Sequence, residues 1–204
     1  MVYNLDFIEI GTSDFDTLIQ TATNSTIGIS IDPIQLYLDN LPNKDNVIKL
    51  NCAISDISGT ATVFYIKPED IIKYSLPNWV RGCNSINNPH PTVVKLLKNK
   101  NITYNSVVST KTIQIMTLYQ LYDLYNINNV KYLKIDTEGH DCSILDKFYE
   151  DILKYKLCLP SKILFESNIL TNKEAVINTI NKYTSLGYVI IKNEGDTILQ
   201  LSNV

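Results

Sequence analysis

Short apolar runs alternate with amphipathic segments along most of the chain. The apolar runs are typical of buried strands, and the amphipathic segments repeat their apolar residues at helical spacing. This alternation predicts an α/β fold in which a mostly parallel sheet is flanked by helices. Strands are expected at residues 5–10, 27–31, 47–54, 60–66, 106–115, 131–135, 163–165, 188–191 and 197–201. Helices are expected at residues 14–23, 33–41, 92–100, 116–125, 142–155 and 173–185.

Two segments depart from this alternation. Gly195 and Asp196 separate the last two apolar runs, which predicts an antiparallel hairpin at the C-terminal end of the sheet. Residues 67–91 contain four prolines and show no regular pattern. A loop of this length in a compact domain usually has a function, and Trp79 favours an ordered one. We therefore expect a single domain over residues 1–204, with a lid or substrate loop at about residues 67–91.

The composition is that of an ordinary globular protein, with 45% hydrophobic and 19% charged residues. A net charge of −3 gives no electrostatic reason to expect a nucleic-acid partner. No apolar run is long enough to span a bilayer, and no signal peptide is recognisable at the N-terminus. The four cysteines are scattered and predict reduced thiols rather than a disulfide framework. These features predict a cytoplasmic protein without a membrane partner.

Chemically useful residues follow the first three strands. Glu9 and Gly11 precede a predicted helix whose N-terminus can receive an anionic group. Asp32 lies about 20 residues beyond Gly11, where an acid commonly binds ribose hydroxyls of a nucleotide. Small and apolar residues at 53–54 can flank an adenine ring. Together these strand ends predict an adenosine-containing cofactor.

The glycine pattern of the first loop discriminates between two such cofactors. A dinucleotide fingerprint needs Gly-x-Gly-x-x-Gly, whereas residues 11–16 read Gly-Thr-Ser-Asp-Phe-Asp. The missing glycines disfavour the close backbone approach that a pyrophosphate requires, and so disfavour NAD. S-Adenosylmethionine has no phosphate, and Glu9 or Asp14 together with backbone N–H groups can bind its ammonium and carboxylate.

A second cluster follows the strand expected at 131–135. Asp136, Glu138 and His140 come directly after it, and Gly139 permits a tight turn. These side chains can titrate, bind a metal or hold a substrate hydroxyl. The alternative interpretation is a solvated turn in which the acids stabilise the N-terminus of the next helix.

The sequence resembles the FkbM family over nearly its whole length. The resemblance rests on residues 7–18 (Phe-Ile-Glu-Ile-Gly-Thr-Ser-Asp-Phe-Asp-Thr-Leu), 28–33 (Gly-Ile-Ser-Ile-Asp-Pro), 53–59 and, most specifically, 133–140 (Leu-Lys-Ile-Asp-Thr-Glu-Gly-His). It implies a class I Rossmann-like fold and S-adenosylmethionine-dependent methyl transfer to an oxygen, often a sugar or polyketide hydroxyl. The first loop departs from the more usual Gly-Ala-Asn-x-Gly, and almost no residues precede the first strand.

Two groups of binding residues are expected. The cofactor-binding group comprises Glu9, Gly11, Thr12, Ser13, Asp14, Asp32, Pro33, Ala53, Ile54, Ser85 and Asp136. In the 67–91 loop, Arg81 and Asn84 can bind a carboxylate and Trp79 can stack on a sugar or cap the methionine arm. Trp79 as a core anchor and Arg81 in a surface ion pair are the alternatives.

Two mechanisms fit these residues. In the first, His140 or Asp136 acts as general base on the acceptor hydroxyl, and Glu138 belongs to the same catalytic turn. In the second, a divalent metal such as Mg²⁺ lowers the pKa of the hydroxyl, with Asp136, Glu166 and Asn168 as ligands, as in catechol O-methyltransferases.

The acceptor is expected to be a small-molecule or glycan hydroxyl, and a homodimer is plausible. Two other functions compete with this one. A non-catalytic methyltransferase-like binding module is disfavoured by the intact acids, and an NAD-linked sugar oxidoreductase is disfavoured by the missing glycines.

Overall fold

The structure is a computed structural model that describes residues 3–86, 88–168 and 171–202. The chain divides into two compact units. Unit 1 comprises Met1–Ser58 and Ile115–Val204, and unit 2 comprises Gly59–Gln114. Unit 1 therefore contains every strand end at which an acid was predicted to act, and unit 2 contains the whole of residues 67–91.

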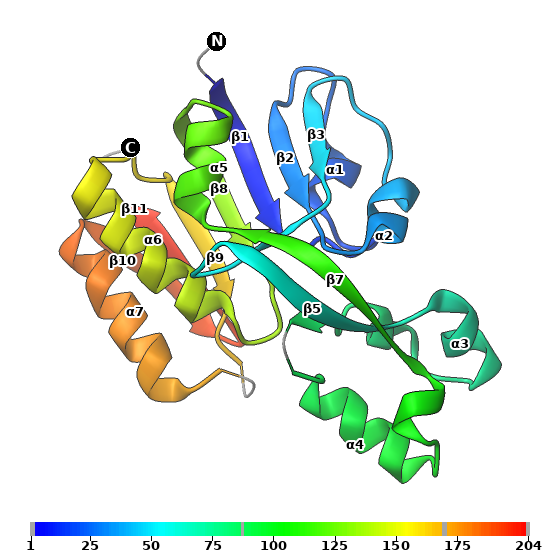
Figure 1. Cartoon of the computed structure of the whole chain (residues 1–204). Helices are drawn as coiled ribbons and strands as arrows, with labels where there is room; N and C mark the ends of the chain where they lie inside the picture. The colour runs from blue at the N-terminus through cyan, green and yellow to red at the C-terminus, as the bar shows by residue number, and fades with distance from the viewer. Residues whose placement is uncertain (1–2, 87, 169–170, 203–204) are drawn as a thin grey trace. The chain divides into compact units, whose positions relative to one another are not determined.

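Within the described residues, unit 1 is built on a seven-stranded sheet with the order β10-β11-β9-β8-β1-β2-β3 (Figure 1). Neighbouring strands from β9 to β3 are parallel, whereas β11 is antiparallel to both β9 and β10. The predicted mostly parallel sheet with a C-terminal antiparallel hairpin is thus confirmed. The strands are β1 (Tyr3–Ile10), β2 (Gly28–Ile31), β3 (Val47–Leu50), β8 (Ile127–Ile135), β9 (Lys162–Glu166), β10 (Tyr188–Glu194) and β11 (Asp196–Leu201).

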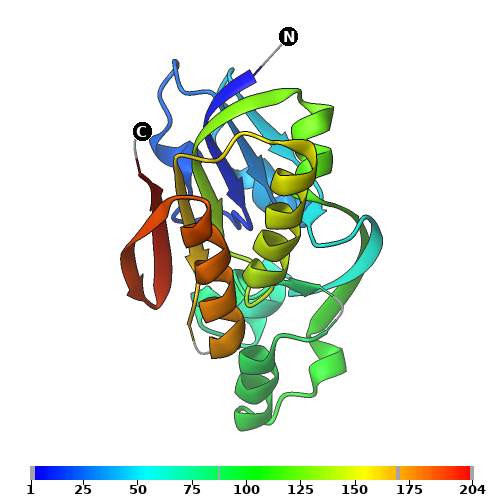
Figure 2. The same ribbon diagram turned by 90° about the vertical axis from the view of Figure 1, so that its left-hand side faces the viewer.

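Helices pack on both faces of this sheet. One face is covered by α5 (Leu118–Leu124), α6 (Asp141–Tyr155) and α7 (Lys173–Ser185), whose apolar residues share a core with the central strands. Figure 2 shows α6 and α7 side by side along that face. The short helices α1 (Leu18–Thr21) and α2 (Gln35–Asn40) pack on the other face.

The central strands are apolar because both of their faces are buried. Ile8, Ile29, Leu133 and Ile163 are completely buried, one on each of four adjacent strands. Each such side chain contributes about 1.5–3 kcal/mol relative to an exposed position. This core fixes the strand register, and the register in turn fixes which residues emerge together at the carboxyl edge of the sheet.

The first helix is shorter than the sequence pattern predicts. Residues 14–23 were expected to be helical, but α1 begins only at Leu18. Ser13 and Asp16 adopt positive φ angles of 48° and 54°, which interrupt any helix. Pro33 was also expected in the first turn of a helix, whereas α2 begins at Gln35.

The strand expected at residues 47–54 is also divided. β3 ends at Leu50, and a separate short strand, β4 (Ala53–Ile54), follows. β4 pairs with Ile115 and Met116, the last two residues of β7 (Val108–Met116), instead of continuing in the large sheet. The backbone therefore changes sheet at this point, which the continuous apolar pattern did not reveal.

Unit 2 has its own small apolar core. Its strand β5 (Gly59–Ile66) pairs with β7 and with β6 (Ser85–Ile86), and Ile66, Val80 and Leu97 are among the buried residues. Its helices are α3 (Pro68–Lys73), η1 (Asn78–Arg81), α4 (Pro91–Asn99) and η2 (Tyr104–Ser106). The expectation that residues 67–91 lack regular structure is wrong, because Pro68 and Pro91 each begin a helix.

Among the described residues, none of the helices has both the length and the apolar character needed to cross a membrane.

Candidate active site at the carboxyl edge of the sheet

The register of the parallel strands brings four predicted residues into one row. Ile10 pairs with Ile31 on one side and with Ile135 on the other, and Ile135 pairs with Phe165. The residues that follow these partners, on β2, β1, β8 and β9 in turn, are Asp32, Gly11, Asp136 and Glu166. Three carboxylates thus lie along the carboxyl edge of the sheet, with a residue that has no side chain between the first and the second. In open α/β sheets this edge is where ligands bind.

Gly11 occupies the most crowded position of the row. Its φ angle is +79°, and a Cβ atom there would overlap the backbone carbonyl oxygen of Asp136. Its N–H donates to the carbonyl of Ile31 at 2.9 Å, and the N–H of Asp136 donates to the carbonyl of Ile10 at 3.0 Å. Only glycine therefore lets the first loop leave β1 this close to β8.

Gly11→Ala is expected to destabilise the protein by about 2–4 kcal/mol, because the new methyl group must displace strand backbone. Gly195→Ala is a matched control: Gly195 also has a positive φ, of 73°, but nothing lies within 4 Å of its Cβ position. Urea unfolding of both variants measures the difference. Equal losses for the two would show that the φ angle alone, and not the contact with Asp136, requires glycine.

Glu9 shapes the first loop from inside the protein. Its side chain is fully buried; one carboxylate oxygen accepts from Lys134 Nζ at 2.8 Å and the other from the N–H of Leu18 at 2.8 Å. Lys134 Nζ also donates to the carbonyl of Asp16 at 3.0 Å. Burial raises the pKa of Glu9, and Lys134 opposes this shift. The pair ties the loop and the start of α1 to β8.

Asp32 binds the backbone of the same loop. Its carboxylate accepts from the N–H of Ser13 at 2.8 Å and from the N–H of Ile34 at 2.7 Å. The side chain is buried, and this burial raises its pKa to about 7. Thr12, between Gly11 and Ser13, has a buried hydroxyl without a hydrogen-bond partner among the described residues.

The other predicted cofactor residues of unit 1 surround these strand ends. Asp14 accepts a hydrogen bond from Asn40 Nδ2 at 2.9 Å. Ala53 and Ile54 are buried in β4, and Pro33 is half-buried after β2. Ser85, which was predicted with this group, belongs to unit 2.

The turn after β8 is held by Asp141, which was not among the predicted site residues. Asp141 is fully buried at the start of α6. One of its carboxylate oxygens accepts from the N–H of Thr137 at 2.9 Å and also from the Thr137 hydroxyl. The other accepts from the N–H of Glu166 at 2.8 Å. One buried carboxylate thus fixes the ends of β8 and β9. In the sequence, the signal for this role was an acid directly after Gly-His at the start of a predicted helix.

The carboxylates around this turn raise one another's pKa values. Desolvation by the surrounding protein, followed by the charges of Asp141 and Glu138, raises the pKa of Asp136 to about 7, although its side chain has solvent access. Desolvation and then the charges of Glu138 and Asp136 raise the pKa of Glu166 to about 8. A cation placed among these groups would relieve the repulsion.

Glu166 and Asn168, predicted as metal ligands, lie together after β9. Asn168 Nδ2 donates to Glu166 Oε1, whereas Glu166 Oε2 is buried without a hydrogen-bond partner among the described residues. The electrostatic interaction between Glu166 and Asp136 places both carboxylates in one acidic region. Hard oxygen donors of this kind suit a divalent cation.

Glu166→Gln is expected to make the protein more stable than wild type at pH 8.5, by about 1 kcal/mol. The pKa of Glu166 is raised from 4.5 to about 8 in the folded protein, so the folded state holds this proton more tightly than the unfolded state. The stabilisation it provides is complete below pH 4.5 and is lost as the pH rises through 8. Urea unfolding at pH 5 and pH 8.5 measures the effect, with the exposed Glu194→Gln as control. A Glu166→Gln advantage that does not grow with pH would contradict this assignment.

His140 completes the turn and contacts the loop after β4. Its Nε2 lies 2.9 Å from Ser55 Oγ and 3.4 Å from Asp56 Oδ1. Ser55 Oγ in turn donates to Asp56 Oδ1 at 2.9 Å. All three residues belong to unit 1, so the structure brings the loop that follows the predicted adenine-side residues 53–54 together with the turn predicted to be catalytic.

The predicted residues of the 67–91 segment lie in unit 2. Trp79 is 43% exposed on η1, so it is not the core anchor that was the alternative interpretation. Asn84 Nδ2 donates to the carbonyl of Arg81 at 3.0 Å. The assignment of these residues to substrate, and of Ser85 to cofactor, stays a prediction.

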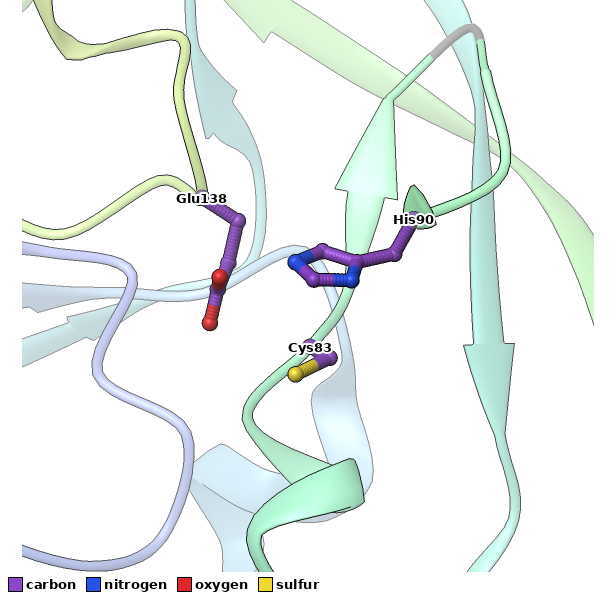
Figure 3. A group of neighbouring side chains, drawn as sticks. All are labelled: Cys83, His90 and Glu138. Atoms are coloured by element: carbon purple, nitrogen blue, oxygen red, sulfur yellow. The ribbon is translucent and has the colours of Figure 1, made fainter. Parts of the chain in front are cut away.

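Unit 2 also holds a cysteine and a histidine that the sequence pattern did not connect. Cys83 Sγ lies within 4.8 Å of a ring nitrogen of His90, and Figure 3 shows both side chains. His90 is buried at the start of α4, and Cys83 follows η1. Glu138, also drawn in Figure 3, belongs to the turn after β8 in unit 1 and has a positive φ of 56°.

Comparison with known proteins agrees with this architecture. The protein-family model for the methyltransferase FkbM domain matches residues 9–189 of the sequence. The crystal structure of methyltransferase FkbM from Methylobacillus flagellatus KT superposes with a TM-score of 0.51 at 14% sequence identity, covering 98% of this chain and 44% of that one. The chain thus spans less than half the length of that protein, and the likeness at this identity shows the fold alone.

No curated protein matches the sequence. The family match extends from Glu9 at the end of β1 to β10, and the chain therefore belongs to the FkbM methyltransferase family.

Proposed function

We propose that this protein is an S-adenosylmethionine-dependent O-methyltransferase that acts on a sugar or glycan hydroxyl. The observation that carries the proposal is the row Asp32, Gly11, Asp136 and Glu166 at the carboxyl edge of the sheet. The family supports methyl transfer, and the row suits a cofactor that combines ribose hydroxyls with a positive charge. The nature of the acceptor rests on the resemblance described from the sequence.

The residues present fit this cofactor. Each oxygen of the Asp32 carboxylate accepts one backbone hydrogen bond and keeps a second lone pair, which can accept a ribose hydroxyl. The buried Thr12 hydroxyl lacks a partner among the described residues and is a further polar contact in the same loop.

The carboxylates on the other side of Gly11 fit the charge. S-Adenosylmethionine supplies an electrophilic methyl group on a positively charged sulfur. Desolvation and then the charges of Asp141 and Glu138 raise the pKa of Asp136, and a cation beside these acids is held more tightly than a neutral molecule. After transfer the sulfur would no longer be charged, so the same carboxylates would hold the demethylated product less strongly.

The protein's own part in the reaction is to orient the acceptor and remove its proton. His140 and Asp136 are the two candidate bases, and we favour His140 because its Nε2 is already anchored by Ser55 and Asp56. In this arrangement Asp136 faces the cofactor, and Glu138 adds negative charge to the turn.

A divalent metal is the alternative means of activating the hydroxyl. Asp136, Glu166 and Asn168 would hold such an ion. Desolvation and then the charges of Glu138 and Asp136 raise the pKa of Glu166, and the repulsion among these carboxylates supports a cation between them. The chemistry that a metal would supply is a lower pKa for the acceptor hydroxyl. Activity that persists in the presence of a strong chelator would favour the base mechanism.

The proposed function is tested by labelling. The protein is incubated with S-adenosylmethionine carrying a deuterated methyl group and with a panel of glycans and nucleotide sugars, and the products are analysed by mass spectrometry. The expected result is a labelled methyl group on a sugar oxygen. Label found on nitrogen or carbon of an acceptor would refute O-methylation, and NAD-dependent oxidation of the same sugars would support the competing oxidoreductase.

A further inference from the structure

His140 lies at the meeting point of two loops of unit 1, and the protons of this contact can be counted. Its Nε2 has two neighbours, Ser55 Oγ at 2.9 Å and Asp56 Oδ1 at 3.4 Å. Ser55 Oγ donates its single proton to Asp56 Oδ1 at 2.9 Å. Since the carboxylate can only accept, the hydroxyl proton satisfies both contacts when it points to Asp56, and the Ser55 oxygen then accepts from His140.

Both neighbours of Nε2 are therefore hydrogen-bond acceptors. An ionised carboxylate has no proton to donate, and the serine hydroxyl donates its hydrogen bond to that carboxylate. Nε2 must then carry the imidazole proton, since an unprotonated Nε2 would face two oxygen lone pairs. In the neutral ring the other nitrogen, Nδ1, holds the free lone pair and is the basic atom.

The three residues differ in exposure, and the Asp56 side chain is the most exposed of them at 45%. Ser55 is 3% exposed, and its N–H donates to the carbonyl of Met116 at 2.9 Å, so its backbone is held in place. His140 is the N-cap residue of α6, yet its side chain makes no capping hydrogen bond to that helix. The His140 side chain is 28% exposed, so part of the ring can be reached from solvent.

We propose that Ser55 and Asp56 are positioning residues that hold His140 as the Nε2–H tautomer and so make Nδ1 the catalytic base. This role rests on the proposed methyltransferase function. The acceptor oxygen gives its proton to Nδ1 and forms the bond to the methyl carbon, while the electron pair of the broken carbon–sulfur bond stays on sulfur. The imidazolium that results is stabilised by the Asp56 carboxylate behind Nε2.

The proposal is tested by NMR of protein labelled with ¹⁵N-histidine. The chain has two histidines, and His140→Gln identifies which ring signals belong to His140. Under conditions in which the ring is neutral, the expected result is a protonated Nε2 and an unprotonated Nδ1. A proton on Nδ1 in the wild-type protein would overturn the proposal.

Two variants of Asp56 separate positioning from general structure. Asp56→Ala frees the Ser55 hydroxyl to donate to Nε2, so the Nδ1–H tautomer is expected to appear. Asp56→Asn retains an acceptor oxygen and is expected to keep the wild-type tautomer. Asp123→Asn, on the exposed surface of α5, is the control. Unchanged ring signals in Asp56→Ala, with a native backbone amide spectrum, would also overturn the proposal.

This measurement needs neither cofactor nor acceptor. Failure of methyl transfer in the labelling experiment would reject the proposed function, whereas the wrong tautomer would reject only the roles of Ser55 and Asp56.

Discussion

Replacing Asp32 by alanine is expected to weaken the binding of S-adenosylmethionine roughly 100-fold. The variant loses the proposed acceptor for the ribose hydroxyls, and it also releases the N–H groups of Ser13 and Ile34 that the carboxylate holds. The first loop and the sugar site are thus lost together. Isothermal titration calorimetry with S-adenosylmethionine measures the change.

Two comparisons make the Asp32 result interpretable. Asp136→Ala removes a carboxylate from the same row but leaves the first loop tied to β2, so its effect on cofactor affinity should be much smaller. Asp32→Asn keeps the size of the side chain and is the conservative comparison. Circular dichroism of the Asp32→Ala, Asp32→Asn and Asp136→Ala proteins detects any misfolding. Equal losses of affinity for Asp32→Ala and Asp136→Ala would contradict the roles assigned to the two acids.

His140→Gln is expected to lower kcat by a factor of about 10² to 10⁴ while leaving cofactor affinity nearly unchanged. Glutamine is polar and of similar length, but it cannot take a proton from the acceptor hydroxyl. Steady-state kinetics with the acceptor found by labelling measures kcat, and calorimetry measures the affinity.

Asp136→Asn discriminates between the two candidate bases. If His140 is the base, Asp136→Asn should reduce kcat less than His140→Gln does. A His140→Gln enzyme that retains full turnover beside an inactive Asp136→Asn enzyme would transfer the role of base to Asp136.

The sequence pattern was sufficient for the sheet because the determinants of the sheet are local. Apolar runs such as the one ending at Ile135 are buried on both faces, and the turn at Gly195 follows from turn chemistry. Acids placed directly after such runs had to meet at one edge once the strands were parallel. Asp32, Asp136 and Glu166 could therefore be predicted to lie together without any knowledge of side-chain contacts.

The details that escaped prediction depend on residues far apart in the chain. The short α1 reflects the contacts of Glu9 with Leu18 and Lys134, and Lys134 lies 125 residues from Glu9. Apolar periodicity cannot report such a pairing. The division of the strand expected at 47–54 likewise depends on the pairing of β4 with Met116.

The site itself shows the same limit. Asp141 was interpretable from sequence only as an acid at a helix start, yet it binds the N–H groups of both Thr137 and Glu166. The contact of His140 with Ser55 joins residues 85 positions apart. Residue types and strand ends indicated where the chemistry lies, whereas the hydrogen bonds that organise it required the folded structure.

The proposed cofactor site is tested most directly by calorimetric titration of the wild-type protein with S-adenosylmethionine and, separately, with NAD. We expect one S-adenosylmethionine molecule bound per chain and no binding of NAD, because the row around Gly11 suits ribose beside a positive charge and the first loop lacks the glycines that a pyrophosphate needs. Binding of NAD alone would favour the oxidoreductase, and binding of neither compound would contradict the assignment of this edge of the sheet as a cofactor site.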